Sequence, residues 1–258
     1  LKNKSRYVKN TQYKENIITS SNLSNIFRKY LSTSLKDEYK RKIICFSNLK
    51  LINQFFDKNI YLKINGPVTP DHVIRIKHKP LFIDFSKVKI NNLEKEINKK
   101  INNYKNQYIK YYNRNKHLNK QAIMHDPNPR LIIVKGMGLF STGKNFVDAQ
   151  IAMDVGINSL SVIMNAIKYG KFKTIDEKEI FRMEYWPLEL AKIKKSNLPL
   201  QGNVTVISGG LGTIGYATAL KFLKEGSEVV LLDKIKNNKN INGMSFFKCD
   251  LTNEDEIR

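Results

Sequence analysis

A glycine-rich segment near residue 210 combines the residue types that bind a dinucleotide. An apolar stretch, residues 204–207, is followed by glycines at three-residue intervals: Gly209, Gly212 and Gly215. Gly209 would permit a tight turn after a strand, Gly212 would let the backbone approach a pyrophosphate, and Gly215 would let the next helix pack closely on the sheet. The N-terminus of that helix would add amide donors and partial positive charge. The sequence therefore predicts phosphate binding at this turn.

An acidic residue, Asp233, ends the next apolar stretch, 18 residues beyond Gly215. A carboxylate at this place can accept hydrogen bonds from both hydroxyls of an adenosine ribose, and it would repel a 2′-phosphate. We therefore expect NAD rather than NADP, although Lys234 and Lys236 could compensate the charge of a phosphate.

A third apolar stretch, residues 244–248, precedes Asp250 and Leu251. An aspartate just past a strand end can meet the adenine amino group, and a leucine offers apolar cover. The expected cofactor-binding residues are Ser208, Gly209, Gly212, Thr213, Ile214, Gly215, Asp233, Asp250 and Leu251.

The segment after the glycines has helical spacing, with an expected inner face of Ile214, Ala217, Leu220 and Leu223. A strand, a turn, a helix, a second strand and an acid thus follow in order. A glycine-rich turn alone is weak evidence, but this complete unit favours nucleotide binding over a merely structural β-α-β unit.

The elements that would position these residues alternate along the chain. Hydrophobic periodicity predicts helices at residues 21–31, 48–56, 88–115, 145–169 and 176–195, and strands at residues 42–46, 81–85 and 131–134. Glycine and proline mark turns at residues 66–70, 136–138 and 141–143, and a loop at residues 125–129. Alternating strands and helices predict an α/β protein.

The chain has 258 residues and a net charge of +22, which raises the question of a nucleic-acid partner. Its densest basic stretch, residues 95–120, interleaves lysines with Tyr104, Tyr108, Tyr111 and Tyr112, a pattern that could stack on single-stranded bases. The same stretch has the periodicity of an amphipathic helix, and lysine, asparagine and isoleucine are abundant throughout, as an AT-rich genome would produce. The pattern favours a solvated helix over nucleic-acid binding.

Other features bound the class of protein. A run of about 18 apolar residues, the length of a membrane-spanning helix, is absent from the sequence, and its first ten residues are polar, unlike a signal peptide. Cys45 and Cys249 lie far apart, so a disulfide framework or a cysteine-based zinc module is not expected. We expect a soluble, cytoplasmic protein with no membrane partner.

Residues 208–215, together with Asp233 and Asp250-Leu251, resemble the opening of a short-chain dehydrogenase/reductase. That family usually has threonine where Ser208 stands, and its classical members have glycine where Thr213 stands. In this sequence the glycine stands one position earlier, at Gly212, as in the extended members of the family. The resemblance implies a Rossmann fold and an NAD(P)-dependent oxidoreductase.

Four upstream segments carry a second resemblance: residues 66–75 (GPVTPDHVIR), 126–130 (DPNPR), 138–140 (GLF) and 183–186 (MEYW). They are similar to bifunctional proteins that join a class II aldolase/adducin-like domain to a short-chain dehydrogenase, of the rhamnulose-phosphate aldolase/alcohol dehydrogenase type. The resemblance implies cleavage of a sugar-phosphate by one domain and NAD-linked oxidation of a small hydroxy-aldehyde such as lactaldehyde by the other. The sequence does not determine whether the protein forms an oligomer.

This resemblance divides the chain into three parts. Residues 1–175 would be the C-terminal part of the aldolase/adducin-like domain, residues 176–201 a helical linker, and residues 202–258 the first βαβαβ half of a Rossmann domain. The expected fold is thus a partial aldolase-like α/β region followed by half of a Rossmann fold.

Two departures from the families matter. Class II aldolases hold zinc with three histidines, one of them in a His-Gly-Leu turn, but Met137 stands at that position, and the four histidines form no His-x-His pair: His72, His78, His117 and His125. We therefore assign no metal ligand, and zinc is expected only if its ligands lie before Leu1. The serine and Tyr-x-x-x-Lys pair of a short-chain dehydrogenase would lie beyond Arg258, so we expect a truncated fragment without catalytic residues. Residues 252–255 read as a helix cap and first turn.

His72 and Arg75 are a tentative substrate or anion site, since Arg75, Lys77, His78 and Lys79 would make a surface that attracts anions. A lone histidine is more often structural, so both interpretations of His72 stay open. For the whole chain, the alternatives are an NAD-dependent sugar epimerase of the extended type, suggested by the glycine spacing, and a basic nucleic-acid-binding protein.

Overall fold

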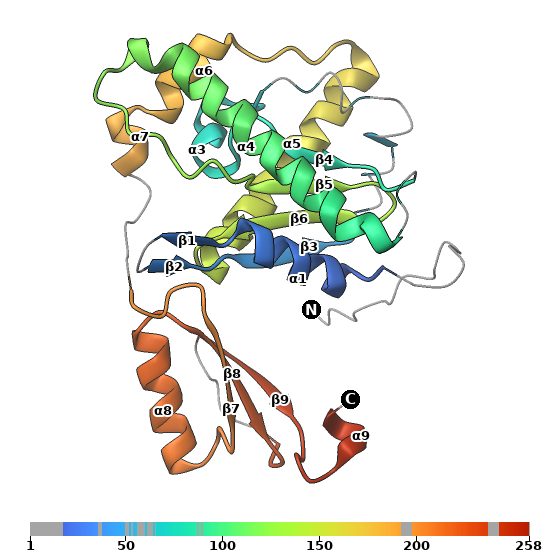
Figure 1. The fold of residues 1–258 in the computed structure, drawn as a ribbon, viewed down its shortest axis with the longest axis vertical. Coiled ribbons are helices and arrows are strands. Elements are labelled where there is room, and N and C mark those ends of the chain that lie inside the picture. Colours follow the sequence, from blue (N-terminus) through green and yellow to red (C-terminus); the bar gives the residue numbers. More distant parts are fainter. Residues whose placement is uncertain are drawn as a thin grey trace.

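The structure is a computed structural model that describes residues 18–35, 38–49, 52, 54–55, 60, 64, 66–86, 88, 90–191, 198–236 and 243–257. These residues form an N-terminal unit (residues 18–191) and a C-terminal unit (residues 198–257), each built from strands and helices (Figure 1). The predicted α/β class is confirmed. Residues 50, 51, 53 and 56 of the helix predicted at residues 48–56, and the polar first ten residues, lie outside the described residues.

A four-stranded mixed sheet with the order β3-β6-β5-β4 forms the centre of the N-terminal unit. Its strands are β3 (Ile43–Ser47), β4 (Leu81–Ile83), β5 (Leu131–Val134) and β6 (Gly138–Gly143); β4 and β5 are parallel, and the other pairs are antiparallel. Every residue of β5 is buried. Because side chains alternate along a strand, Leu131 and Ile133 enter the core on one face, and Ile132 and Val134 enter the core on the other.

Helices cover both faces of this sheet (Figure 1). On one face lie α1 (Ser20–Leu31) and α4 (Leu93–Asn115), whose apolar stripes meet Ile132, Val134 and Phe140. On the other face lies α5 (Phe146–Tyr169), which packs on Leu131, Ile133 and Leu139. The helices predicted at residues 21–31, 88–115 and 145–169 are thus confirmed, and each buries one face against the sheet.

Helix α5 is long and apolar enough to cross a membrane by length and composition, and it is the one helix among the described residues that passes this test. The expectation from the sequence had missed this segment. Its residues Ala149, Ala152, Met153, Leu160 and Ile163 are buried against the sheet, as in the core helix of a folded domain.

Shorter elements complete the N-terminal unit. They are the hairpin β1 (Thr33–Leu35) and β2 (Glu38–Lys40), the 3₁₀ turns η2 (Pro70–His72), η3 (Ile90–Asn92) and η4 (Lys116–Leu118), and the helices α3 (Val73–Ile76), α6 (Glu177–Glu184) and α7 (Pro187–Ala191). Tyr185 and Trp186 separate α6 from α7, so the continuous helix predicted over residues 176–195 is wrong: Pro187 lacks the N–H that a helix interior requires.

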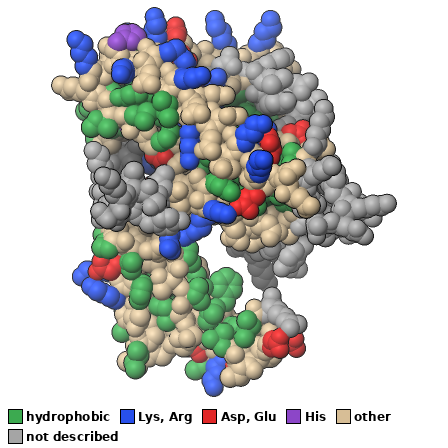
Figure 2. Space-filling view, viewed as in Figure 1, with side chains coloured by type: hydrophobic (Ala, Val, Ile, Leu, Met, Phe, Trp, Pro, Cys, Tyr) green, Lys and Arg blue, Asp and Glu red, His purple; other side chains and the backbone are tan. Residues whose placement is uncertain are grey.

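The C-terminal unit contains β7 (Val204–Ser208), α8 (Thr213–Lys224), β8 (Glu228–Asp233), β9 (Met244–Lys248) and α9 (Glu254–Ile257). Its three strands are parallel and stand in the order β7-β8-β9. The inner face of α8 is centred on Ala219, with Tyr216, Phe222 and Leu223 against Val229 and Leu231. The other face of the sheet leaves Val204, Val206 and Phe247 about half exposed, and apolar side chains are visible over this unit in Figure 2.

The predicted inner face of α8 is partly wrong. Leu223 packs on the sheet, but Ile214 is 85% exposed and Leu220 is 47% exposed. The helix begins at Thr213, with Gly215 lying against the turn before it. With this start, Ala219 faces β8. Leu220 points about 100° away from it, because successive helix positions are rotated by about that angle.

The turn predicted at residues 141–143 is also wrong, because these residues belong to β6. Small polar residues suit a buried strand here because their hydroxyls find partners: Ser141 Oγ donates to the Ala149 carbonyl at 2.7 Å, and Thr142 Oγ1 donates to the Pro129 carbonyl at 2.9 Å. Gly143 has no room for a side chain, since a Cβ would lie 2.2 Å from the Ala149 nitrogen.

The two units touch through polar contacts. Arg28, which also donates to the Lys42 carbonyl of its own unit at 2.9 Å, donates to the Gly202 carbonyl of the C-terminal unit at 2.7 Å. The first N–H of α5, at Phe146, donates to the Glu228 carboxylate at 2.7 Å, where a negative charge suits the positive end of the helix.

Candidate nucleotide site and a buried polar cluster

The glycine-rich turn lies at the carboxyl edge of the parallel sheet. Ser208 ends β7, Asp233 ends β8, and Asp250 follows β9 by two residues. The register pairs Ser208 with Leu232 and Asp233 with Lys248, so the three strand ends lie beside one another. The structure thus brings the predicted cofactor-binding residues to one edge, where open α/β sheets bind their ligands.

Glycine is required at the three positions of the turn for different structural reasons. Gly209 has a φ of +60°, the left-handed conformation that favours glycine. Gly212 is the N-cap of α8, and a Cβ there would lie 3.3 Å from the Gly209 carbonyl oxygen. At Gly215 a Cβ would lie 2.2 Å from that same oxygen. Gly215 therefore lets the first turn of α8 close onto the glycine-rich turn.

Asp233 is tied to this turn by its carboxylate. Oδ2 accepts the backbone N–H of Leu211 at 3.0 Å, and Oδ1 accepts the N–H of Ile235 at 3.1 Å. The hydrogen bonds from Ile235 and Leu211 hold the pKa of Asp233 below its ordinary value, so the group is a carboxylate at neutral pH. Each oxygen keeps a lone pair that could accept a further hydroxyl.

The other predicted cofactor residues differ in surroundings. Asp250 accepts the Thr252 backbone N–H at 3.0 Å and the Thr252 hydroxyl at 2.8 Å, which lowers the pKa of Asp250. Leu251 is 46% exposed, and Ile214 projects from the first turn of α8 into solvent.

The anion-attracting surface predicted at residues 75–79 is not continuous. Lys77 is buried, so the prediction is wrong at that position, whereas Arg75 and His78 are partly buried and Lys79 is exposed. His72 lies 3.1 Å from the Ser159 hydroxyl through Nδ1, and Arg75 is partly buried on α3. Of the four tyrosines that could stack on bases, Tyr104, Tyr108 and Tyr111 are buried and Tyr112 is partly buried, which does not favour base stacking.

A buried polar cluster, which sequence analysis did not foresee, lies between α3, α4 and α6. We name it the Lys77–Glu184 cluster. Its members are Lys42, Lys77, Tyr108, Tyr111, Asp126, Glu184 and Tyr185. Three of the segments that carried the second resemblance contribute to it or adjoin it: residues 66–75 lead into Lys77, residues 126–130 begin with Asp126, and residues 183–186 contain Glu184 and Tyr185.

Glu184 is the last residue of α6 and is 1% exposed. Its carboxylate accepts the Tyr108 hydroxyl at 2.6 Å and the Tyr111 hydroxyl at 2.9 Å, and Tyr185 joins Tyr108 through their hydroxyls at 2.9 Å. His125 Nδ1 lies 3.9 Å from the same carboxylate. Burial raises the pKa of Glu184, against the opposing effects of Lys77 and the two tyrosines.

Lys77 faces this carboxylate from the end of α3. Its ammonium nitrogen lies 3.4 Å from the centre of the Tyr108 ring and donates to the Asp126 carbonyl. The Asp126 carboxylate binds Lys42 at 2.5 Å. Burial opposes ionisation of Asp126, but Lys42 and Arg130 outweigh it and hold the pKa of the carboxyl well below its usual range.

The sequence did hold a signal for this cluster. Glu184 continues the apolar face of α6 one turn after Ile180 and Phe181, and Tyr108 and Tyr111 extend the buried stripe of α4. Buried polar groups are hydrogen-bonded as a rule. A carboxylate on the apolar face of one helix and hydroxyls on the apolar face of another are therefore expected to meet.

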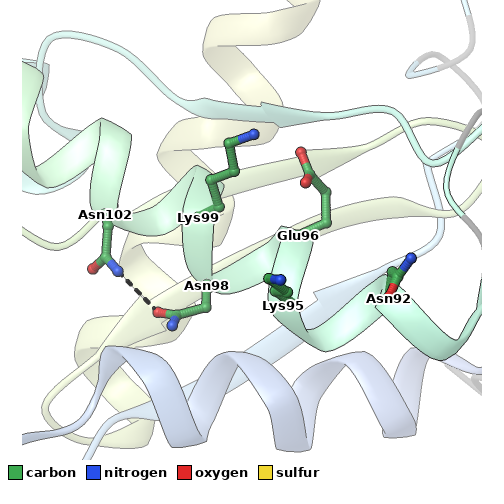
Figure 3. A pocket seen from close by; sticks show the side chains of 6 residues that line it. All are labelled: Asn92, Lys95, Glu96, Asn98, Lys99 and Asn102. Carbon is green, nitrogen blue, oxygen red and sulfur yellow. Dashed lines mark hydrogen bonds between the residues drawn. The ribbon is translucent and has the colours of Figure 1, made fainter.

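A groove of about 490 Å³ runs along α4, lined by Asn92, Lys95, Glu96, Asn98, Lys99 and Asn102 (Figure 3). Its walls come from η3 and one face of α4, and Asn102 bonds Asn98 at 3.1 Å. Its side chains are mixed in charge and exposed, and they form no acid–base or metal-binding set.

The described part of the chain contains no group of three or more His, Cys, Asp or Glu side chains that could hold a metal ion. Met137 stands where the class II aldolase turn has a histidine. These residues do not fit a zinc site.

Comparison with known proteins assigns the N-terminal unit. The family model "Aldolase class II, second domain" matches residues 19–193, from the start of α1 to the end of α7. The chain belongs to the class II aldolase second-domain family. The matched region contains the whole Lys77–Glu184 cluster and ends before the C-terminal unit, so the cluster is internal to a class II aldolase second domain.

Two curated relatives are similar to this chain. One is "Uncharacterized oxidoreductase YuxG" of Bacillus subtilis (strain 168), 28% identical over 208 residues, which cover 75% of this chain and 30% of that protein. The other is "Short-chain dehydrogenase reductase 3c" of Arabidopsis thaliana, 35% identical over 69 residues, which cover 24% of this chain and 27% of that protein. The chain thus spans about a third or less of their lengths. No solved structure matches it.

Proposed function

We propose that the chain is part of an NAD-dependent oxidoreductase of the short-chain dehydrogenase type, joined to its class II aldolase second domain. The observation that carries the proposal is the edge formed by the glycine-rich turn and Asp233. Three parallel strands in the order β7-β8-β9, with α8 crossing between the first two, match the first half of a Rossmann fold. Similarity to two proteins named as an oxidoreductase and a dehydrogenase supports the same class.

The nucleotide would be held at four places. The N-terminal amides of α8, after Gly212, would bind the pyrophosphate, with Ser208 and Thr213 beside it. Asp233 would accept ribose hydroxyls, and Asp250 with Leu251 would border the adenine. Bound NAD would supply the hydride chemistry, and these residues would orient it.

NAD is favoured over NADP because the Asp233 carboxylate would face a 2′-phosphate of like charge. Lys234 follows Asp233 and lowers its pKa, so a positive charge does lie nearby. The substrate we propose, a small hydroxy-aldehyde such as lactaldehyde, and the location in the cytoplasm rest on the family resemblance alone. A sugar epimerase of the extended type is a second candidate because of the Gly209-x-x-Gly212-x-x-Gly215 spacing.

Titration of the chain with NAD and NADP by calorimetry tests the proposal. We expect NAD to bind at least tenfold more tightly than NADP, and Asp233→Ala to weaken NAD binding at least tenfold. Glu225→Ala is the matched control, because Glu225 is an acid at the opposite end of α8 that pairs with Lys221. Absence of binding of both nucleotides to folded protein would contradict the proposal.

A further inference from the structure

The Lys77–Glu184 cluster places ionisable side chains in the interior of the N-terminal unit. Lys77 is 4% exposed and Glu184 is 1% exposed. Burying charged side chains costs more desolvation free energy than burying apolar side chains of similar volume, so buried charges are weak evidence for stability. The proposed nucleotide site lies in the other unit and does not use them. A role beyond stability would account for a cluster of this kind.

Lys77 also has an unusual backbone. Its φ is +62°, and it is the one non-glycine residue with a positive φ in the part of the chain that the structure describes. A side chain other than glycine is strained in this conformation. Here the strain turns the chain after α3 so that the lysine points inward onto the Tyr108 ring and the Asp126 carbonyl. Strained backbone that places a reactive side chain is a feature of functional sites.

The surroundings of Lys77 favour the neutral amine. Burial lowers its pKa to about 7, Glu184 and Asp126 act against this, and Arg130 and Lys42 act with it. A buried lysine with other cations nearby is the arrangement that activates lysine as a nucleophile, because the unprotonated amine carries the reactive lone pair. Lys77 differs in this respect from the exposed lysines of α4.

We propose that Lys77 is a nucleophilic amine that forms an imine with a short-chain aldehyde or ketone, assisted by Glu184 and Tyr108. The amine lone pair attacks the carbonyl carbon, the carbon–nitrogen bond forms as the carbon–oxygen π bond breaks, and one proton passes from the nitrogen to the oxygen. The hydroxyl of this carbinolamine then takes a second proton and leaves as water when its carbon–oxygen bond breaks, while the nitrogen gives up its remaining proton and the carbon–nitrogen double bond forms. The sum is amine plus carbonyl to imine plus water, with no oxidant or reductant.

Glu184 and Tyr108 are placed to move these protons. Their hydrogen bond, at 2.6 Å, joins a hydroxyl donor to a carboxylate acceptor beside the amine. Burial raises the pKa values of both groups, so both hold protons more tightly than in water. His125, 31% exposed, connects Glu184 toward solvent.

The space around Lys77 restricts the ligand to small molecules. A cavity of about 20 Å³, bordered by Lys77, His78 and the apolar side chains of Ile76, Leu131 and Leu160, has room for about one water molecule. Asp126, whose carbonyl accepts a hydrogen bond from the amine, has a side chain that is 27% exposed. We therefore expect a short carbonyl compound to reach the amine when this contact opens.

Reductive trapping tests the proposal on the full chain. The protein is incubated with glycolaldehyde or dihydroxyacetone and sodium cyanoborohydride at pH 7.5, and the modified lysines are mapped by mass spectrometry. We expect Lys77 to be labelled at least tenfold faster than exposed Lys110. Its labelling rate should rise with pH through a midpoint near 7, well below the ordinary pKa of a lysine side chain of about 10.5.

Two variants and a control separate chemistry from structure. Lys77→Arg keeps a long basic side chain without the nucleophilic amine and should abolish the fast label, whereas the control Lys110→Arg should leave it unchanged. Glu184→Gln should slow labelling of Lys77 without moving the label elsewhere. Labelling of Lys77 at or below the rate of Lys110 in folded wild-type protein overturns the proposal, even if Lys77→Arg does not fold. The result does not depend on nucleotide binding, so this proposal and the proposed function can fail separately.

Discussion

The Asp233 carboxylate, at the end of β8, accepts the backbone N–H of Leu211 in the glycine-rich turn at 3.0 Å. The acid expected to bind a ribose therefore also holds the turn expected to bind the phosphates. Its second oxygen accepts the N–H of Ile235, so the carboxylate joins the loops that follow β7 and β8. These two roles of Asp233 can be separated by experiment.

Asp233→Asn keeps an oxygen that can accept one of the two N–H groups, whereas Asp233→Ala keeps neither. We expect both variants to lower the midpoint of thermal unfolding without nucleotide, with the alanine variant lower. NAD affinity should fall in both by at least tenfold, since the amide lacks the charge that strengthens hydrogen bonds to ribose. Differential scanning calorimetry and NAD titration check this. Equal stability of wild type and Asp233→Ala would show that the contact with Leu211 does not hold the turn.

Gly215→Ala should disrupt the glycine-rich turn. The new Cβ would lie 2.2 Å from the Gly209 carbonyl oxygen and 2.9 Å from its carbon, and both are backbone atoms that cannot rotate away. We expect a loss of about 1–3 kcal/mol in the free energy of unfolding, as for other overpacked sites, and a loss of nucleotide binding. Gly170→Ala is the control, because its nearest neighbour would be 3.9 Å away. Denaturant unfolding measures both, and equal stabilities would contradict the close contact.

Lys77 and Glu184 should be strongly coupled in stability. Lys77→Met removes the positive charge that lowers the pKa of Glu184, and Glu184→Gln removes the negative charge that raises the pKa of Lys77. Each variant should lower the free energy of unfolding by about 3–5 kcal/mol. The double variant should lose much less than the sum, because neither buried charge remains. A double-mutant cycle by urea unfolding measures the coupling. Additive losses would mean that the two side chains do not interact.

The stability contributed by Lys77 should depend on pH in one direction. Its pKa is about 7 in the folded protein and 10.5 ordinarily, so between these values the unfolded chain binds more protons. The free energy of unfolding should therefore rise with pH above about 7, relative to Lys77→Met, by up to about 1.4 kcal/mol per pH unit. Below about pH 7 the difference should be flat. Urea unfolding at pH 6, 7.5 and 9 measures it, and a difference that falls with pH would contradict the buried amine.

Much of the fold was predictable because it depends on local periodicity. The stripes of Leu23, Phe27 and Leu31, and of Ile97, Ile101 and Tyr104, are visible at helical spacing and are the faces that are buried. Strands β5 and β9 were predicted at the observed residues, and the helix predicted at residues 145–169 differs from α5 by one residue at its start. The errors came where tertiary contacts override local preference, as for Ser141 and Thr142, whose hydroxyls are satisfied inside a strand.

The sequence by itself determined the glycine-rich turn, because glycine at fixed spacing and an acid after the next strand are local requirements of one β-α-β unit. Only the tertiary structure decided that Lys77, Asp126 and Glu184, which are 49 and 58 residues apart in succession, share one buried cluster. The physical reason is that a buried charge needs partners from other elements, and its own neighbours in the sequence do not specify them. The same holds for Asp233, whose contact with Leu211 exists only once β7 and β8 are paired.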